Sequence, residues 1–192
     1  NLTNNGTINC ATFMGSGGIF FNNATFTNNG TINEQFESNR GFFPASGTNS
    51  FVNTGTFNKT TTFSFSNNGV PVTNSGTLQG IGTITLNGLG NTNTGIIRPG
   101  TSPGILGLSA NLLTGQTPTV RIEILGPGFV AGTDYDQLTF NAATVDVSGT
   151  TLIVEEDDVN ALPGSYTIMN NAGGVFTSAF ASVLLPLNYS IT

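Results

Sequence analysis

A five-residue unit recurs along the first half of this chain and limits what it can fold into. The unit reads Asn-x-Gly-Thr followed by an apolar residue, and its last copy has Ile in place of Thr. Its glycine stands at Gly6, Gly30, Gly55, Gly76 and Gly95, at intervals of 24, 25, 21 and 19 residues. A period of roughly 20–25 residues with β-type composition is typical of rungs that stack on one another. The repeat therefore predicts an all-β protein with a parallel β-helix over about residues 1–100.

Stacking the copies at about 4.8 Å per rung aligns equivalent residues into columns along the solenoid. The main inward apolar column is predicted to comprise Ile8, Ile32, Phe57, Leu78 and Ile97. A second apolar column, just before the corner, comprises Phe26, Phe51 and Val72. A ladder of side-chain amides at the corner comprises Asn4, Asn28, Asn53, Asn74 and Asn93. An outward column comprises Thr7, Thr31, Thr56 and Thr77. Each glycine of the unit is expected to supply either a positive φ or a close approach of two backbones.

The rest of the chain is less regular. We expect residues 34–50 to form a longer loop or an irregular rung edge, because insertions in repeat proteins map to loops. Two Pro-Gly pairs between residues 98 and 105 indicate tight turns, and the strands beyond them are longer and more aliphatic. Alternating residues predict strands at 120–124, 135–140, 144–147, 151–154, 165–169 and 187–192. Residues 101–192 are therefore expected to continue or cap the solenoid.

The composition excludes several classes of function. Only 7% of the residues are charged, whereas 37% are hydrophobic and 15 are Phe. Disordered chains combine high charge with few aromatic residues, so this chain is expected to fold. The net charge is −6, and the four cations, Arg40, Lys59, Arg98 and Arg121, form no cluster in the sequence. We therefore expect no nucleic-acid binding and no docking on anionic membranes. No apolar run approaches the ~20 residues of a membrane span, so membrane insertion is not expected.

Two residue types that carry much of protein chemistry are scarce. His is absent, and Cys10 is the single cysteine. The commonest general base is thus missing, and both an internal disulfide framework and a multi-cysteine metal site are excluded. We expect no cofactor, and we interpret Cys10 as a small buried residue of its rung.

Residues 95–169 resemble a known group of proteins. The segment 98–106, RPGTSPGIL, resembles the PGxSPGxL turn of bacterial β-strand-repeat and autotransporter passenger-like surface proteins. Segments 122–126 and 132–138 resemble the E-[IL]-x-G and Y-D-x-L elements that follow it there, and 147–154 fits the subsequent GxLxV strand. With the Asn-x-Gly-Thr units, the resemblance covers nearly the whole chain. It implies a secreted or surface-displayed right-handed parallel β-helix, usually in adhesins or other large extracellular proteins.

Acidic residues are the main candidates for a site. Asp134 and Asp136 could share Ca²⁺ or act as paired carboxylates, but Ca²⁺ needs more ligands than two, which favours Asp residues that bind backbone amides in a turn. The run Glu155-Glu156-Asp157-Asp158 could bind a cation or a basic partner, although such runs are usually solvated loops. A polysaccharide-cleaving β-helix would need acids and bases along a groove. The only acids in residues 1–100 are Glu34 and Glu37, with Arg40 nearby.

The outward threonines allow another interpretation. A flat hydroxyl array can bind ice in β-solenoids that carry two parallel Thr columns. Here the neighbouring column comprises Asn9, Asn33, Asn58 and Gln79. That composition favours a structural polar ladder over an ice-binding face.

These observations favour a structural role without a catalytic, cofactor-binding or metal-binding residue. We expect a non-enzymatic β-solenoid of a secreted or cell-surface protein, acting as an adhesin, stalk or filament-forming subunit. The repeat is already under way at Asn1, and the predicted strand ending at Thr192 has no cap, so we expect a piece of a longer protein or self-association through the solenoid ends. The alternative is a carbohydrate-binding or polysaccharide-cleaving β-helix with surface glycans as partners.

Overall fold

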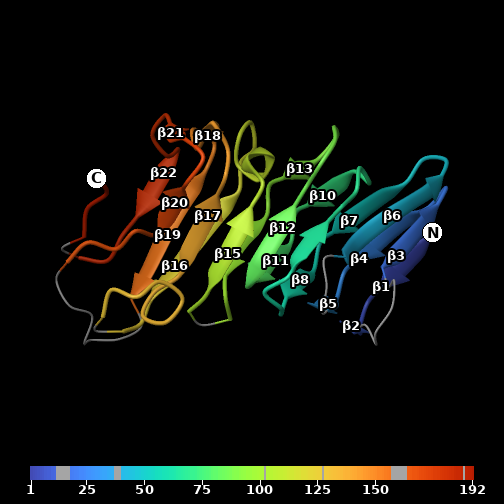
Figure 1. Ribbon diagram of the computed structural model, residues 1–192, viewed down its shortest axis with the longest axis horizontal. Coiled ribbons are helices and arrows are strands. Elements are labelled where there is room, and N and C mark those ends of the chain that lie inside the picture. The colour runs from blue at the N-terminus through green and yellow to red at the C-terminus, as the bar shows by residue number, and fades with distance from the viewer. Residues whose placement is uncertain (12–17, 37–39, 102, 127, 157–163, 188) are drawn as a thin grey trace.

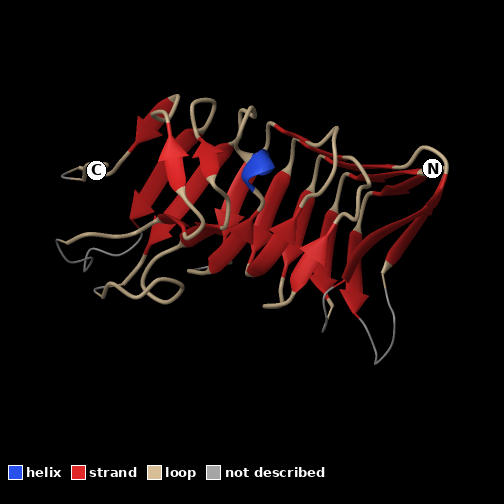
Figure 2. Cartoon of the chain, turned by 45° about the horizontal axis from the view of Figure 1, so that its top comes forward, coloured by secondary structure: helices blue, strands red, loops and turns tan. Residues whose placement is uncertain are grey.

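The strands of the protein stack into a rod with the two termini at opposite ends (Figure 1). This computed structural model describes residues 1–11, 18–36, 40–101, 103–126, 128–156, 164–187 and 189–192. Successive strands contribute in turn to three long sheets of five, eight and seven strands, and to one two-stranded sheet. Each strand pair within these sheets is parallel, as Figure 2 shows from a second direction. The predicted parallel β-helix is confirmed.

The sheets are named here by their place in each coil. Sheet 1 contains β1 (Leu2–Asn4), β4 (Thr25–Asn28), β7 (Ser50–Asn53), β10 (Val72–Asn74) and β13 (Thr92–Asn93). Sheet 2 contains β2 (Thr7–Ala11), β5 (Thr31–Gln35), β8 (Thr56–Lys59), β11 (Thr77–Gly80), β14 (Ile96–Pro99), β16 (Thr119–Ile124), β19 (Thr151–Glu156) and β22 (Ser182–Leu184). Sheet 3 contains β3 (Ile19–Asn22), β6 (Arg40–Ser46), β9 (Ser64–Ser66), β12 (Gly82–Thr85), β15 (Ile105–Leu108), β17 (Gln137–Phe140) and β20 (Met169–Asn171). The small fourth sheet pairs β18 (Thr144–Asp146) with β21 (Val175–Thr177).

The register of these strands reproduces the predicted columns. In sheet 2, Ile8 pairs with Ile32, and the column continues through Phe57, Leu78 and Ile97. In sheet 1, Phe26, Phe51 and Val72 pair in the same way. Apart from Ile8 at the first coil, these residues are buried. The repeat unit therefore builds the core directly.

The corner asparagines form a continuous ladder inside the solenoid. Each Nδ2 donates to the Oδ1 of the next Asn at 2.7, 2.7, 2.6 and 2.7 Å, from Asn4 through Asn28, Asn53 and Asn74 to Asn93. Asn28 and Asn53 also donate to the carbonyls of Thr56 and Thr77. Because buried amides need partners, a neutral ladder that repeats at every coil satisfies the corner without any charge.

The glycine of the unit is required by close approach of the coils. A Cβ built on Gly30, Gly55, Gly76 or Gly95 would lie 2.0–2.1 Å from the carbonyl oxygen of the preceding glycine in the column. None of these glycines has a positive φ. Of the two reasons offered by the sequence, close backbone approach is thus the one that applies.

The described part of residues 34–50 forms strands where a longer loop was one expectation. The other expectation, an irregular rung edge, agrees with the register shift of the β3–β6 pair between Phe21 and Asn22. β5 extends to Gln35, and β6 spans Arg40–Ser46 and pairs with β3 and β9. Phe42 stabilises this strand, because its fully buried ring packs against the rings of Phe51 and Phe65. The centroid of the Phe42 ring lies 4.7 Å from that of Phe51 and 4.9 Å from that of Phe65. Pro44 is tolerated because β6 pairs with β9 only through its first two residues.

Sheets 2 and 3 continue beyond residue 100. β14 pairs with β16, and β15 pairs with β17. In sheet 1 the asparagine ladder ends where Asn93 donates to the Leu112 carbonyl, at the end of the 3₁₀ helix η1 (Ala110–Leu112). β18 contacts η1 and starts the fourth sheet. Residues 101–192 therefore continue the solenoid with an aliphatic core.

The predicted C-terminal strands are confirmed in part. β16, β18 and β19 match the predictions at 120–124, 144–147 and 151–154, while β17 begins two residues later than the segment predicted at 135–140. Of 165–169, only Met169 lies in a strand. The strand predicted at 187–192 is wrong for the described residues, since the last strand is β22. The Tyr189 N–H donates to the Pro186 carbonyl, and among the described residues sheet 3 ends at β20.

Candidate functional site

A hollow lies at the C-terminal end of the stack. Sheet 2 reaches β22 in the last coil, whereas sheet 3 stops at β20, one coil earlier. The difference leaves a cavity of about 940 Å³ over the buried side chains of Ile124, Val147 and Val154. The core of the solenoid is therefore open at this end.

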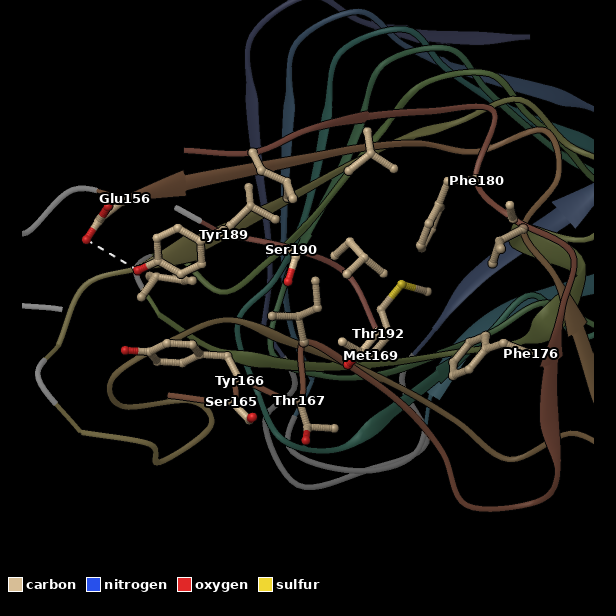
Figure 3. A pocket seen from close by; sticks show the side chains of 18 of the residues that line it. Glu156, Ser165, Tyr166, Thr167, Met169, Phe176, Phe180, Tyr189, Ser190 and Thr192 are labelled. Atoms are coloured by element: carbon tan, nitrogen blue, oxygen red, sulfur yellow. Dashed lines mark hydrogen bonds between the residues drawn. The ribbon is translucent and has the colours of Figure 1, made fainter. Parts of the chain in front are cut away.

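Mainly apolar side chains line this cavity. Figure 3 shows Phe176 and Phe180 on one side and Tyr166 and Tyr189 on the other, with Met169 between them. The Tyr189 hydroxyl donates to Glu156 Oε1 at 3.3 Å. Burial, reinforced by the nearby Glu156 carboxylate, raises the pKa of Tyr189, so the hydroxyl stays a donor. The apolar side chains suit an apolar occupant, and the Tyr189–Glu156 pair adds one polar contact to the lining.

Asp134 and Asp136 bind backbone amides, as the turn interpretation expects. Asp134 Oδ2 accepts the Val130 N–H at 3.0 Å and closes the loop after β16. Asp136 is fully buried, and its two oxygens accept the N–H groups of Gly104 at 2.8 Å and Glu123 at 3.0 Å. Asp136 therefore ties the second Pro-Gly turn to β16. The two carboxylates act on different backbone segments and do not converge on a shared ligand.

A partly satisfied charge cluster surrounds Asp136. Glu123 is buried, and its Oε1 accepts from Arg98 Nη2 at 3.2 Å, while its Oε2 has no hydrogen-bond partner. Burial raises the pKa of Asp136 to about 7 from 3.8, although the two backbone N–H bonds oppose that rise. The charge of Glu123 raises the pKa of Asp136 by less than burial does, and the charge of Arg98 lowers it slightly.

We predict that Asp136 makes the stability of the protein depend on pH. Because its pKa is higher in the folded than in the unfolded chain, the folded protein binds more protons between about pH 4 and 7. The contribution of Asp136 to the free energy of unfolding is fully present below pH 4. As the pH rises through 7, this contribution falls by up to about 4 kcal/mol. Denaturant midpoints measured from pH 4 to 8 should fall with pH in the wild type and much less in Asp136→Asn. The matched control, Asp134→Asn, should keep the wild-type slope, and an unchanged slope in Asp136→Asn would refute this assignment.

The acidic run lies only partly within the described structure. Glu155 forms an ion pair with Arg121 on the outer face of sheet 2, and Glu156 accepts from Tyr189. Asp157 and Asp158 lie outside the described residues. The two described carboxylates thus already have partners on separate elements.

A buried ion pair links the second and third coils. Glu34 on β5 pairs with Lys59 on the adjacent strand β8 of sheet 2, with Nζ 2.6 Å from Oε2 and both side chains at most 2% exposed. Lys59 Nζ also donates to the carbonyl and Oγ1 of Thr61 at 2.9 and 2.7 Å. Glu34 Oε1 accepts the Phe36 N–H at 2.8 Å. Glu37, the other acid of this segment, lies outside the described residues.

Cys10 stacks on Glu34 in the same column. Its side chain is partly buried against the core. Burial, with the Glu34 carboxylate as a second cause, raises the pKa of the Cys10 thiol. The thiol is therefore held in its less reactive, protonated form.

The outward face of sheet 2 carries two polar columns. Thr7, Thr31, Thr56 and Thr77 stack as predicted, and the column passes through Ile96 before Thr119, Thr151 and Ser182. In the second column, Asn33 donates to Asn9 at 2.8 Å, and Asn58 donates to Asn33 at 3.0 Å. The outer amides therefore bond to one another as a ladder.

The described residues contain no group of three or more His, Cys, Asp or Glu side chains that could hold a metal ion. No helix within the same residues has the length and hydropathy of a membrane span.

Sequence reasoning missed the Lys59–Glu34 pair and the end cavity. Alignment of the residues three positions after each repeat threonine would have revealed the pair.

Comparison with protein-family models, with curated proteins and with solved structures found no match to this chain.

Proposed function

We propose that the chain is a structural segment of a secreted or cell-surface protein, a rod that sets distance between the parts it joins. The observation that carries this proposal is the asparagine ladder, which links five coils without interruption. The buried asparagine side chains at each corner bond to the next coil and so stabilise the stack. The acids Asp134, Asp136 and Glu34 likewise bond to the protein's own backbone or cations.

The surface location rests on sequence. The resemblance of residues 95–169 to bacterial surface proteins supports it. Fractionation of the producing cells, with an antibody to the chain, tests it. The proposal expects the chain in the medium or at the cell surface, and recovery in the cytosol alone would refute it.

We predict that the rod can be shortened by one coil. Deleting residues 6–29 joins Asn5 to Gly30 and restores an Asn-x-Gly-Thr unit, while Glu34 and Lys59 are both retained. The deleted chain should fold and be shorter by one rung, about 4.8 Å, in small-angle X-ray scattering. A chain that unfolds, or keeps its length, would contradict a rod of additive coils.

A carbohydrate-binding or polysaccharide-cleaving β-helix is the alternative, and a glycan array separates the two. The structural proposal expects no glycan to be retained by either the intact or the shortened chain. Specific retention by the intact chain would replace it with the binding hypothesis.

A further inference from the structure

Four Asn-Gly pairs occur along the chain, at Asn5-Gly6, Asn29-Gly30, Asn68-Gly69 and Asn87-Gly88. Such a pair can react with itself, because the glycine carries no side chain that would keep its backbone nitrogen away from the asparagine amide. That nitrogen attacks Cγ of the asparagine, a new C–N bond forms, and the amide group leaves as ammonia with the proton of the attacking nitrogen. Water then opens the cyclic imide to aspartate or to isoaspartate, in which the main chain runs through the former side chain.

The fold holds both reacting groups of the pair at Asn29. The Gly30 N–H donates to the Asn4 carbonyl at 3.1 Å, which ties the attacking nitrogen to the preceding coil. Asn29 Nδ2 donates to Asn5 Oδ1 at 2.9 Å, and Asn29 Oδ1 accepts from Thr54 Oγ1 at 2.8 Å. Cyclisation at Asn29 therefore requires the stack to open first.

The pairs at Asn5 and Asn68 are each held at one reacting group. The Gly6 N–H donates to Asn4 Oδ1 at 3.1 Å, so the attacking nitrogen of the first pair is bonded. Asn68 Nδ2 donates to the Phe42 carbonyl at 2.7 Å, so the amide of the second pair is anchored to the coil before it.

The pair at Asn87 differs from the other three. It lies in the exposed loop between β12 and β13. Within the described part of the chain, the Gly88 N–H has no hydrogen-bond partner, and the Asn87 side chain makes one bond, from Nδ2 to Ser66 Oγ at 3.4 Å. A Cβ built on Gly88 would meet nothing nearer than 3.5 Å, so the space around the pair is open. Both reacting groups are thus free to approach each other.

We propose that Asn87 is a covalent modification site, where spontaneous conversion to isoaspartate loosens the corner between the third and fourth coils. The backbone of residue 87 is held on both sides by the fully buried Asn67. Asn67 Oδ1 accepts the Asn87 N–H at 2.6 Å, and Asn67 Nδ2 donates to the Asn87 carbonyl at 2.9 Å. Isoaspartate inserts one carbon between this N–H and this carbonyl, so the two can no longer both meet Asn67. A buried amide that loses a partner destabilises the fold.

Peptide mapping by mass spectrometry over time tests where the chain reacts. The intact chain is kept folded in mildly alkaline buffer, because the attacking nitrogen must lose its proton. We expect Asn87 to react first and Asn29 to react at least about tenfold more slowly, since Asn29 must wait for local opening. In urea, where the fold no longer holds any pair, the four rates should converge. Asn87 reacting no faster than Asn29 in the folded chain, or the same order of rates persisting in urea, would overturn the assignment.

Urea midpoints of aged and fresh protein test the loosening. In aged wild type, a fraction equal to the isoaspartate content should unfold at lower urea than the rest. Asn87→Gln is the control for ageing, because its longer side chain closes a larger ring much more slowly. Asn87→Asp, measured before ageing, is the control for charge, because it carries the same added carboxylate on an unextended backbone. Both variants should keep the midpoint of fresh wild type, and an unchanged midpoint in wild type that contains isoaspartate would refute the loosening.

Discussion

Replacing Gly55 with Ala is expected to destabilise the protein by at least about 3 kcal/mol, whereas the same change at Gly6 leaves stability nearly unchanged. A Cβ on Gly55 would lie 2.0 Å from the Gly30 carbonyl oxygen. Relief requires the two coils to separate, which would weaken the 2.8 Å bond from the Thr56 N–H to that same oxygen. Since Gly55 has no positive φ, the cost is steric and does not come from backbone strain.

Gly6 is the matched control for this prediction. It occupies the same position of the repeat unit in the first coil, and a Cβ there meets nothing within 4 Å. Urea denaturation of both variants, at a concentration where the chain is monomeric, gives the comparison. Equal midpoints for Gly55→Ala and Gly6→Ala would show that the coils do not approach as closely as the structure indicates.

Replacing Lys59 with Met is expected to cost about 3–5 kcal/mol, because it leaves the buried Glu34 carboxylate without its cation. The methionine fills much of the space of the lysine stem, so the loss is mainly electrostatic. Calorimetric or denaturant unfolding measures the effect. The double variant Glu34→Leu/Lys59→Met removes both charges and should recover most of the lost stability.

The exposed ion pair between Arg121 and Glu155 supplies the control. The side chains of this pair are 37% and 35% exposed, so Arg121→Met should cost no more than about 1 kcal/mol. A Lys59→Met variant as stable as Arg121→Met would mean that water reaches Glu34. The buried pair would then have no special part in joining the second and third coils.

Much of the first five coils follows from the sequence, for a physical reason. Parallel stacking fixes the side-chain period, so one recognised unit aligns the neighbouring residues of every coil. The pairing of Ile32 with Phe57 and that of Asn28 with Asn53 follow directly from the repeat unit. The strand at Phe42 was missed because it lies outside the unit, where the length between copies varies and no column is visible.

The ends of the stack and the Asp136 cluster could not be predicted in the same way. After Gly95 the unit disappears, so sequence alone does not show which strands share a coil. Asp136 binds Gly104, 32 residues earlier, through a contact set by the fold. The end cavity arises because sheet 2 extends one coil beyond sheet 3. The alternation at 187–192 looks like a strand, yet the chain turns there and approaches Tyr166, with ring centroids of Tyr189 and Tyr166 6.3 Å apart.

Hydrogen exchange of the asparagine side-chain amides, observed by NMR, tests the continuous ladder most directly. The Nδ2 protons of Asn28, Asn53 and Asn74 are buried and bonded to the next coil, so they should exchange only through openings that approach global unfolding. The side chain of Asn5 is exposed and provides a fast internal reference. Exchange of the three ladder amides at the rate of Asn5 would contradict the account, because the coils would then not be joined through their asparagines.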